Sequence, residues 1–269
     1  MTHSRLFCAL FAAALLAAPV AGAQATNIVT ITPQFQPDKL GSPTSLLFGL
    51  KIADSAGGTP TPLSQAVVRL PAGIAIDPTG VGTCSKATLQ AGGPSACPTN
   101  ALVGVGSAVL EADLGGTVIT ENATITPFLG PPQNGRVVLE LYGDGKTPVS
   151  EQITLEGVLG PDSAPFGQQL VLPIPTIATV PGGPNASVIQ FQLTVGASNI
   201  QYYHTVTVTK KVRRHGRIVK RKVKQRVLFH VRGIIVPKAC PAGGFPFSLV
   251  LTYQDGTSTT TDAAAPCPA

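Results

Sequence analysis

The chain has 269 residues, and its 29 glycines and 25 prolines exclude a fold built from long helices. Only 12% of the residues are charged and 5% are aromatic, and tryptophan is absent, so aromatic platforms for sugar rings or stacked bases are scarce. The formal net charge is +6. Stretches of Val, Ile, Thr and Leu between the glycines and prolines favour short β-strands.

The N-terminus has the pattern of an export signal. Arg5 precedes an apolar run over residues 6–18, which is too short to cross a bilayer as a helix. An Ala-Gly-Ala sequence at 21–23 then provides a small-x-small cleavage site. We therefore expect a signal peptide over residues 1–23 and a secreted mature chain that has no transmembrane segment.

Export makes the cysteines informative. Four of them remain after cleavage: Cys84, Cys97, Cys240 and Cys267. An even number in an oxidising compartment predicts disulfides. Proximity in sequence favours Cys84–Cys97 and Cys240–Cys267, although four cysteines permit three connectivities. There is no Cys-x-x-Cys pair, and we expect neither a metal site nor a cofactor.

Taken in chain order, the apolar stretches predict about a dozen strands. The ranges are 27–31, 45–53, 65–70, 101–111, 116–126, 136–142, 151–158, 168–172, 187–195, a hairpin over 203–232, and 247–253. One short helix is predicted over 85–90, with Ser85 as its N-cap. The small, polar stretch 257–269 is not predicted to be a strand. Strands without long helices between them predict an all-β fold, an antiparallel β-sandwich over 26–269, either as one unit or with a sub-boundary near 127–135.

One segment resembles a known pattern. Leu70-Pro71-Ala72-Gly73-Ile74, Cys84, Cys97-Pro98 and Val103-Gly104-Val105-Gly106 form an "LPAG, Cys, Cys-Pro, Gly-x-Gly" series. It resembles a series in uncharacterised secreted β-sandwich proteins of high-GC soil bacteria. The resemblance covers roughly residues 30 to 110 and implies export and a β-fold, without an activity.

Catalytic motifs are absent from the sequence, and we predict no catalytic residue. One pair of carboxylates gives a third, weaker hypothesis, that of a glycoside-active enzyme. If Asp144-Gly145 is a two-residue hairpin turn, Glu140 lies diagonal to Glu151, at about 7–8 Å. Two carboxyl groups at such a spacing are the minimum for glycoside hydrolysis. We expect instead that both glutamates face solvent from ordinary strands.

The hairpin stands apart from the rest of the chain by its charge. Residues 210–226 hold ten of the 19 lysines and arginines and no acid. Without these ten and the Arg5 of the signal peptide, the body carries a net charge of about −5. The basic character of the protein therefore belongs to one element.

The pattern within this segment is that of paired strands. A His215-Gly216 turn pairs Val212 with Val219 and Val208 with Val223, so that the valines share one face. The same register sets Lys211 opposite Lys220 on the other face. With ten residues in each arm, the hairpin would be about 30 Å long.

We predict that the hairpin binds anions, because ten cations without acids are more than protection against edge-to-edge aggregation requires. The expected partner is an anionic cell-wall polymer or an acidic lipid surface, which would hold the protein at the cell envelope; sequence-specific nucleic-acid binding is not expected. The alternative is a passive structural or adhesive surface module that binds a protein partner. The oligomeric state is left open. The candidate anion-binding residues are Lys211, Arg213, Arg214, Arg217, Lys220, Lys222, Lys224 and Arg226.

Overall fold

The computed structural model describes residues 27–146, 150–179, 183–196, 201–214 and 217–268, and it confirms the predicted all-β, antiparallel fold class. The strands of the large sheet are β1 (Asn27–Gln36), β2 (Pro43–Asp54), β3 (Leu63–Pro71), β4 (Ala75–Asp77), β5 (Gly104–Asp113), β6 (Val118–Gln133), β7 (Arg136–Gly145), β8 (Gln152–Pro161), β9 (Phe166–Pro173), β10 (Ser187–Val195), β13 (Gly233–Ile235), β14 (Phe245–Tyr253) and β15 (Ser258–Ala265). Strands β11 (Gln201–Arg214) and β12 (Arg217–His230) form a second, two-stranded sheet.

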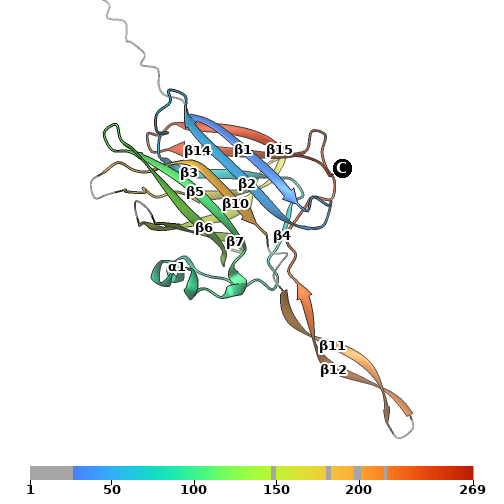
Figure 1. Cartoon of the computed structure of the whole chain (residues 1–269). Coiled ribbons are helices and arrows are strands. Elements are labelled where there is room, and N and C mark those ends of the chain that lie inside the picture. Colours follow the sequence, from blue (N-terminus) through green and yellow to red (C-terminus); the bar gives the residue numbers. More distant parts are fainter. Residues whose placement is uncertain (1–26, 147–149, 180–182, 197–200, 215–216, 269) are drawn as a thin grey trace, which may run out of the picture.

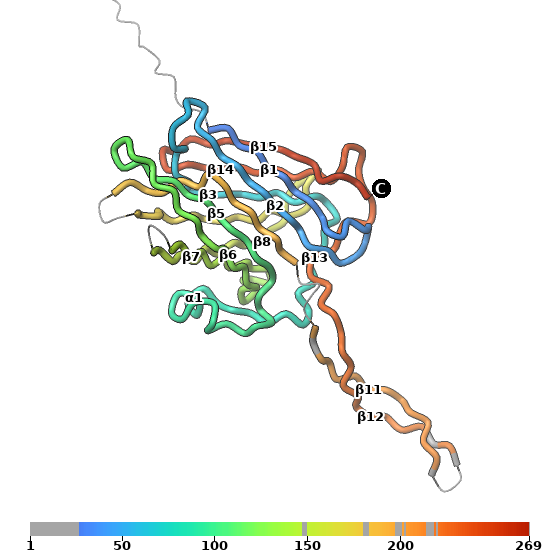
Figure 2. Tube along the Cα trace, in the orientation of Figure 1, coloured from blue at the N-terminus to red at the C-terminus, as the bar shows by residue number. Residues whose placement is uncertain are grey.

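The large sheet folds back on itself (Figures 1 and 2). Its strands run in the order β15-β14-β3-β9-β8-β7-β6-β5-β10-β2-β13-β4, and β1 pairs with β2. Strand β15 begins this order and β1 branches from β2 near its other end, yet β1 and β15 lie in contact. Phe35 of β1 also packs edge-on against Phe245 of β14, with ring centroids 5.4 Å apart. The two ends of the sheet therefore meet, and its two layers face each other across an apolar interior.

Alternation along the strands builds this interior. In β2, the buried side chains of Leu46, Phe48, Leu50 and Ile52 occupy every second position. Side chains at alternate positions of a strand point to the same face, so this series faces the interior. A single residue deleted within β2 would turn the whole series outward.

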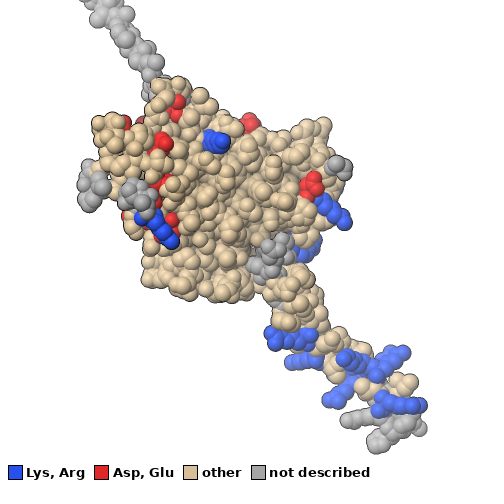
Figure 3. Space-filling model, viewed as in Figure 1, with Lys and Arg blue, Asp and Glu red and all other residues tan. Residues whose placement is uncertain are grey.

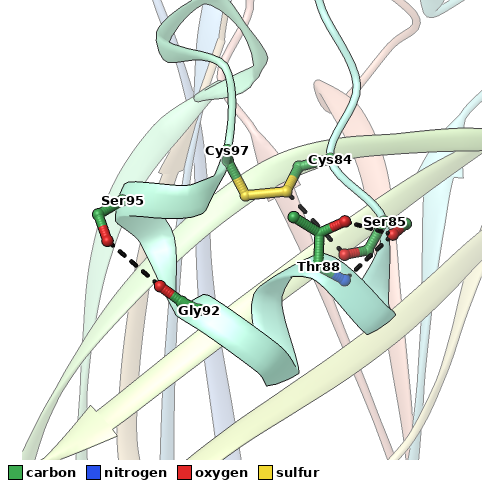
Figure 4. Close-up of a disulfide and its surroundings, with 6 residues drawn as sticks. All are labelled: Cys84, Ser85, Thr88, Gly92, Ser95 and Cys97. Atoms are coloured by element: carbon green, nitrogen blue, oxygen red, sulfur yellow. Dashed lines mark hydrogen bonds between the residues drawn. A yellow bond between two sulfur atoms is a disulfide. The ribbon is translucent and has the colours of Figure 1, made fainter.

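A short helical segment covers the outer face of β6 to β8. Helix α1 (Lys86–Gly92) begins after Ser85, whose Oγ accepts a hydrogen bond of 3.2 Å from the Thr88 N–H, as predicted for an N-cap (Figure 4). The single turns η1 (Pro94–Ala96) and η2 (Thr99–Ala101) follow. Leu89 is fully buried against Phe128 of β6. The segment is thus anchored by one leucine and by its disulfide.

Both predicted disulfides are confirmed. Cys84 and Cys97 are bonded across α1, with Cα atoms 5.4 Å apart (Figure 4). Cys240 and Cys267, with Cα atoms 5.7 Å apart, join the segment before β14 to the segment after β15. Each disulfide therefore joins the two ends of a short segment, with sequence separations of 13 and 27 residues.

Two stretches differ from the expectation. Residues 258–265 form β15, although they are small and largely polar, because residues 245–252 of β14 pair with them. Residues 127–133 continue β6 towards β7, and strands from before and after them belong to the same sheet. The β6–β7 pairing becomes irregular between Gly130 and Gln133, where two prolines supply no N–H for a ladder.

The predicted signal peptide lies outside the described residues. Among those that are described, no helix has the length and apolar character needed to cross a membrane.

Candidate functional site

The cation-rich segment is a regular antiparallel ladder. Strands β11 and β12 pair with each other and with no strand of the large sheet. Figure 1 shows the pair outside the large sheet, beyond β4. Each strand has 14 residues, which corresponds to about 45 Å and exceeds the 30 Å expected. The ladder is longer because the pairing continues down to Gln201 and His230. The predicted turn residues His215 and Gly216 lie outside the described residues.

The register of the ladder confirms the predicted pairs. Val208 lies opposite Val223, and Lys211 lies opposite Lys220. Paired residues of an antiparallel ladder share a face, and faces alternate along each strand. We call the face that bears Val206, Val208, Val212, Val223 and Val227 the valine face; all five valines are half-buried.

The opposite face, which we call the cationic face, carries six of the eight candidate anion-binding residues. They are Lys211, Arg213, Lys220, Lys222, Lys224 and Arg226, and all six are exposed. The four on β12 stand at every second residue, so their Cα atoms repeat at about 7 Å. Figure 3 shows blue atoms gathered along this ladder.

The other two candidates, Arg214 and Arg217, form the last rung of the ladder, next to residues 215–216. The side chains of these two arginines are not among those that the structure describes. Two further cations, Lys210 and Arg221, pair with each other on the valine face. This pair was not among the predicted anion-binding residues, although the predicted hairpin register places Lys210 opposite Arg221.

Little on the hairpin neutralises the cationic face. In the described part of the chain, no ion pair links a cation of β11 or β12 to a carboxylate. The Arg226 guanidinium lies over the ring of Tyr203, 4.0 Å from its centroid. Such a cation–π contact orients the guanidinium without cancelling its charge. The face therefore offers a row of unneutralised cations to an anionic ligand.

The carboxylate pair proposed from sequence is wrong. Strand β7 continues through Asp144 and Gly145, because β6 pairs with both. The turn therefore lies beyond them, where the Gly145 N–H donates to the Glu151 carbonyl over 3.0 Å. Glu151 precedes β8, and the residue opposite Glu140 is Glu156. Glu140 and Glu151 are therefore not diagonal neighbours, and the carboxylate spacing that suggested a glycosidase is not present for this pair.

Glu140 is also not a solvent-facing residue. It is only 1% exposed and lies on the outer face of β7, next to Lys86 of α1. Burial and, to a smaller extent, the neighbouring Glu156 raise the pKa of its carboxyl from 4.5 to about 7, against the opposing effect of Lys86 of α1. A neutral Glu140 can donate a hydrogen bond to Glu156, which an ionised one cannot.

Metal ligands do not gather in the described part of the structure, where no group of three or more His, Cys, Asp or Glu side chains could hold an ion. His204 instead makes an edge-on contact with Phe229, with ring centroids 6.3 Å apart.

Comparison with protein-family models, curated proteins and solved structures gave no match for the chain.

Proposed function

We propose that this protein is a secreted, non-enzymatic β-sandwich that binds a linear polyanion along the cationic face of the β11–β12 ladder. The observation that carries the proposal is the register, which aligns six exposed cations on one face. Without the ten cations of the hairpin and Arg5, the rest of the chain has a net charge of about −5. Export is supported by the sequence of residues 1–23 and by two disulfides, which persist in oxidising compartments. An anionic cell-wall polymer outside the cell has the required chemistry.

A polymer fits this face better than an acidic lipid surface does. An amphipathic element binds a bilayer when its apolar residues and its cations reach the interface together. Here the valines and the cationic row lie on opposite faces, so a hairpin that inserts its valines would turn the row away from the head groups. A linear polymer can follow the row for its whole length and leave the valine face untouched.

The test measures binding of the mature protein to polyphosphate, a linear polyanion without bases or sugars, over a series of salt concentrations. Association with a polyanion releases counterions, so the logarithm of the affinity should fall linearly with the logarithm of the salt concentration. Replacing Lys220 and Lys222 by Gln should weaken binding and make this slope shallower by about 2, one for each lost contact.

The matched control removes the same charge from the other face. A Lys210→Gln, Arg221→Gln variant loses two cations from the valine face. If the polymer follows the cationic face, this control keeps most of the affinity and of the salt slope. Equal losses in both variants would mean that net charge alone attracts the polymer, and that result would overturn the proposed binding face.

Two other outcomes would replace the proposal. Binding to vesicles with an acidic lipid, at an ionic strength where polyphosphate no longer binds, would favour a membrane surface. Capture of one specific protein that survives the Lys220→Gln, Lys222→Gln change would favour the adhesive module, because the free edges of a two-stranded sheet can accept another strand.

A further inference from the structure

The interior of the large sheet is not completely filled. Between the two layers lies a cavity of about 270 Å³, lined almost entirely by aliphatic and aromatic side chains. The buried residues form two separate clusters on either side, and Leu172, Val188 and Phe191 lie between them, only partly buried. All three side chains line the cavity.

This space is long in the direction of the strands. Its lining extends from Val103, just before β5, to Glu111 near the other end of that strand. Eight residues of a strand cover about 27 Å. The size approaches that of small-molecule sites, which begin near 300 Å³. An elongated, apolar space of this kind fits an extended hydrocarbon chain.

The two ends of the cavity differ in polarity. At one end the lining includes Glu121, which is paired with the inward-facing Leu110, and Glu151, which is exposed. At the other end Val103 and Ile234 are buried, and Pro78, Val81 and Gly196 are half-buried and carry no charge. A polar head group is therefore placed at the acidic end, beside the carboxylates.

We propose that this cavity binds a single-chain aliphatic molecule whose head group, uncharged or cationic, lies at the acidic end. The apolar walls supply the affinity, because an apolar cavity this large does not hold water well and gains contacts when a hydrocarbon fills it. The carboxylates supply the selection, because a carboxylate or phosphate head would meet like charges at the acidic end. The site is separate from the cationic face of the hairpin.

The first experiment uses the fluorescent neutral probe N-phenyl-1-naphthylamine with the mature protein. The probe should bind with increased fluorescence, and 1-dodecanol and dodecyltrimethylammonium, each below its aggregation concentration, should displace it. Dodecanoate should need at least a tenfold higher concentration at low salt. Failure of the probe and of 1-dodecanol to bind would overturn the cavity as a site, and displacement by dodecanoate as readily as by the ammonium would overturn the placement of the head group.

The second experiment narrows the cavity. Ala123 of β6 lines it, and its neighbour Asn122 is exposed. Ala123→Leu and Ala123→Phe should weaken binding of the probe progressively, by tenfold or more for phenylalanine. Asn122→Leu adds a similar apolar side chain outside and should change the Kd by less than twofold. Equal effects of Ala123→Leu and Asn122→Leu would mean that the probe adsorbs to the surface.

Folding is monitored in the same variants. If Ala123→Phe does not fold because it overpacks the interior, Ala123→Val keeps the graded series intact. The midpoint of thermal unfolding should rise when 1-dodecanol is added to the parent and rise less in each larger variant, since only a ligand of the folded state stabilises it. A rise of the same size in all variants would contradict the site.

Discussion

Replacing Glu140 by Gln should make the protein more stable at alkaline pH and change it little at acidic pH. In the folded state the pKa of this carboxyl is raised from 4.5 to about 7, first by burial and then by Glu156. The folded state therefore holds a proton that the unfolded state releases between these two values. Because stability falls with pH wherever the folded state binds more protons, the parent should lose stability between about pH 4.5 and 7 and then level off.

The size of this loss follows from the shift. One pKa unit corresponds to about 1.4 kcal/mol, so the ionised Glu140 costs the folded state at most about 3 kcal/mol. Glutamine keeps the shape of the neutral acid and removes the titration. At pH 8 the Glu140→Gln variant should therefore exceed the parent by up to about 3 kcal/mol, which corresponds to roughly 6–12 °C in Tm for a domain of this size.

Urea unfolding at several pH values between 5 and 9, with the disulfides intact, measures the effect. Glu156→Gln removes only the neighbouring charge and should flatten the pH dependence partially, because the burial of Glu140 remains. Glu151→Gln is the exposed control and should leave the profile unchanged. The reasoning would be refuted by a difference between parent and Glu140→Gln that does not vary with pH, or by a variant that is less stable than the parent at pH 8.

Three further predictions concern the disulfides, the ladder and export. Replacing Cys240 and Cys267 together by Ser should cost about 3–4 kcal/mol in urea unfolding, because the bond closes a 27-residue separation, and an unchanged stability would contradict its contribution. Lys220→Glu should turn the repulsion with Lys211 into an attraction worth up to about 1 kcal/mol, seen as slower amide exchange in β11 and β12, and faster exchange would contradict the register. Intact mass should show a mature protein that begins near Gln24 or Thr26 and has no free thiol, whereas alkylation of all four cysteines would contradict export into an oxidising compartment.

The features that were predicted correctly from the sequence depend on residues that lie close together along the chain. The helix cap at Ser85 depends on a residue three positions away, and the two disulfides join cysteines that are neighbours in the sequence. The register of the ladder likewise follows from a tight turn and from alternating valines, which fix the pairing of a hairpin. These features need no knowledge of the rest of the fold.

The errors came from contacts between distant segments. Asp144-Gly145 has the composition of a turn. Both residues instead pair with β6, whose partner residues lie about 20 positions earlier in the chain. Glu140 reads as one polar position of an alternating strand, and only the covering segment around Leu89 removes it from water. Strand β15 has no apolar pattern of its own and depends on β14.

The cavity could not be predicted from the alternation of apolar and polar residues along the strands. An inward series such as Leu139 and Leu141 has the same sequence pattern whether it meets a facing side chain or an open space. The pattern determines which face points inward, and the distance between the layers follows from how thirteen strands curve and close. The only sequence signal is the small size of several inward residues, such as Ala108 and its partner Ala123, and small residues are equally common where layers pack closely. The decisive quantity is a volume, which is why the graded change of size at Ala123 tests it directly.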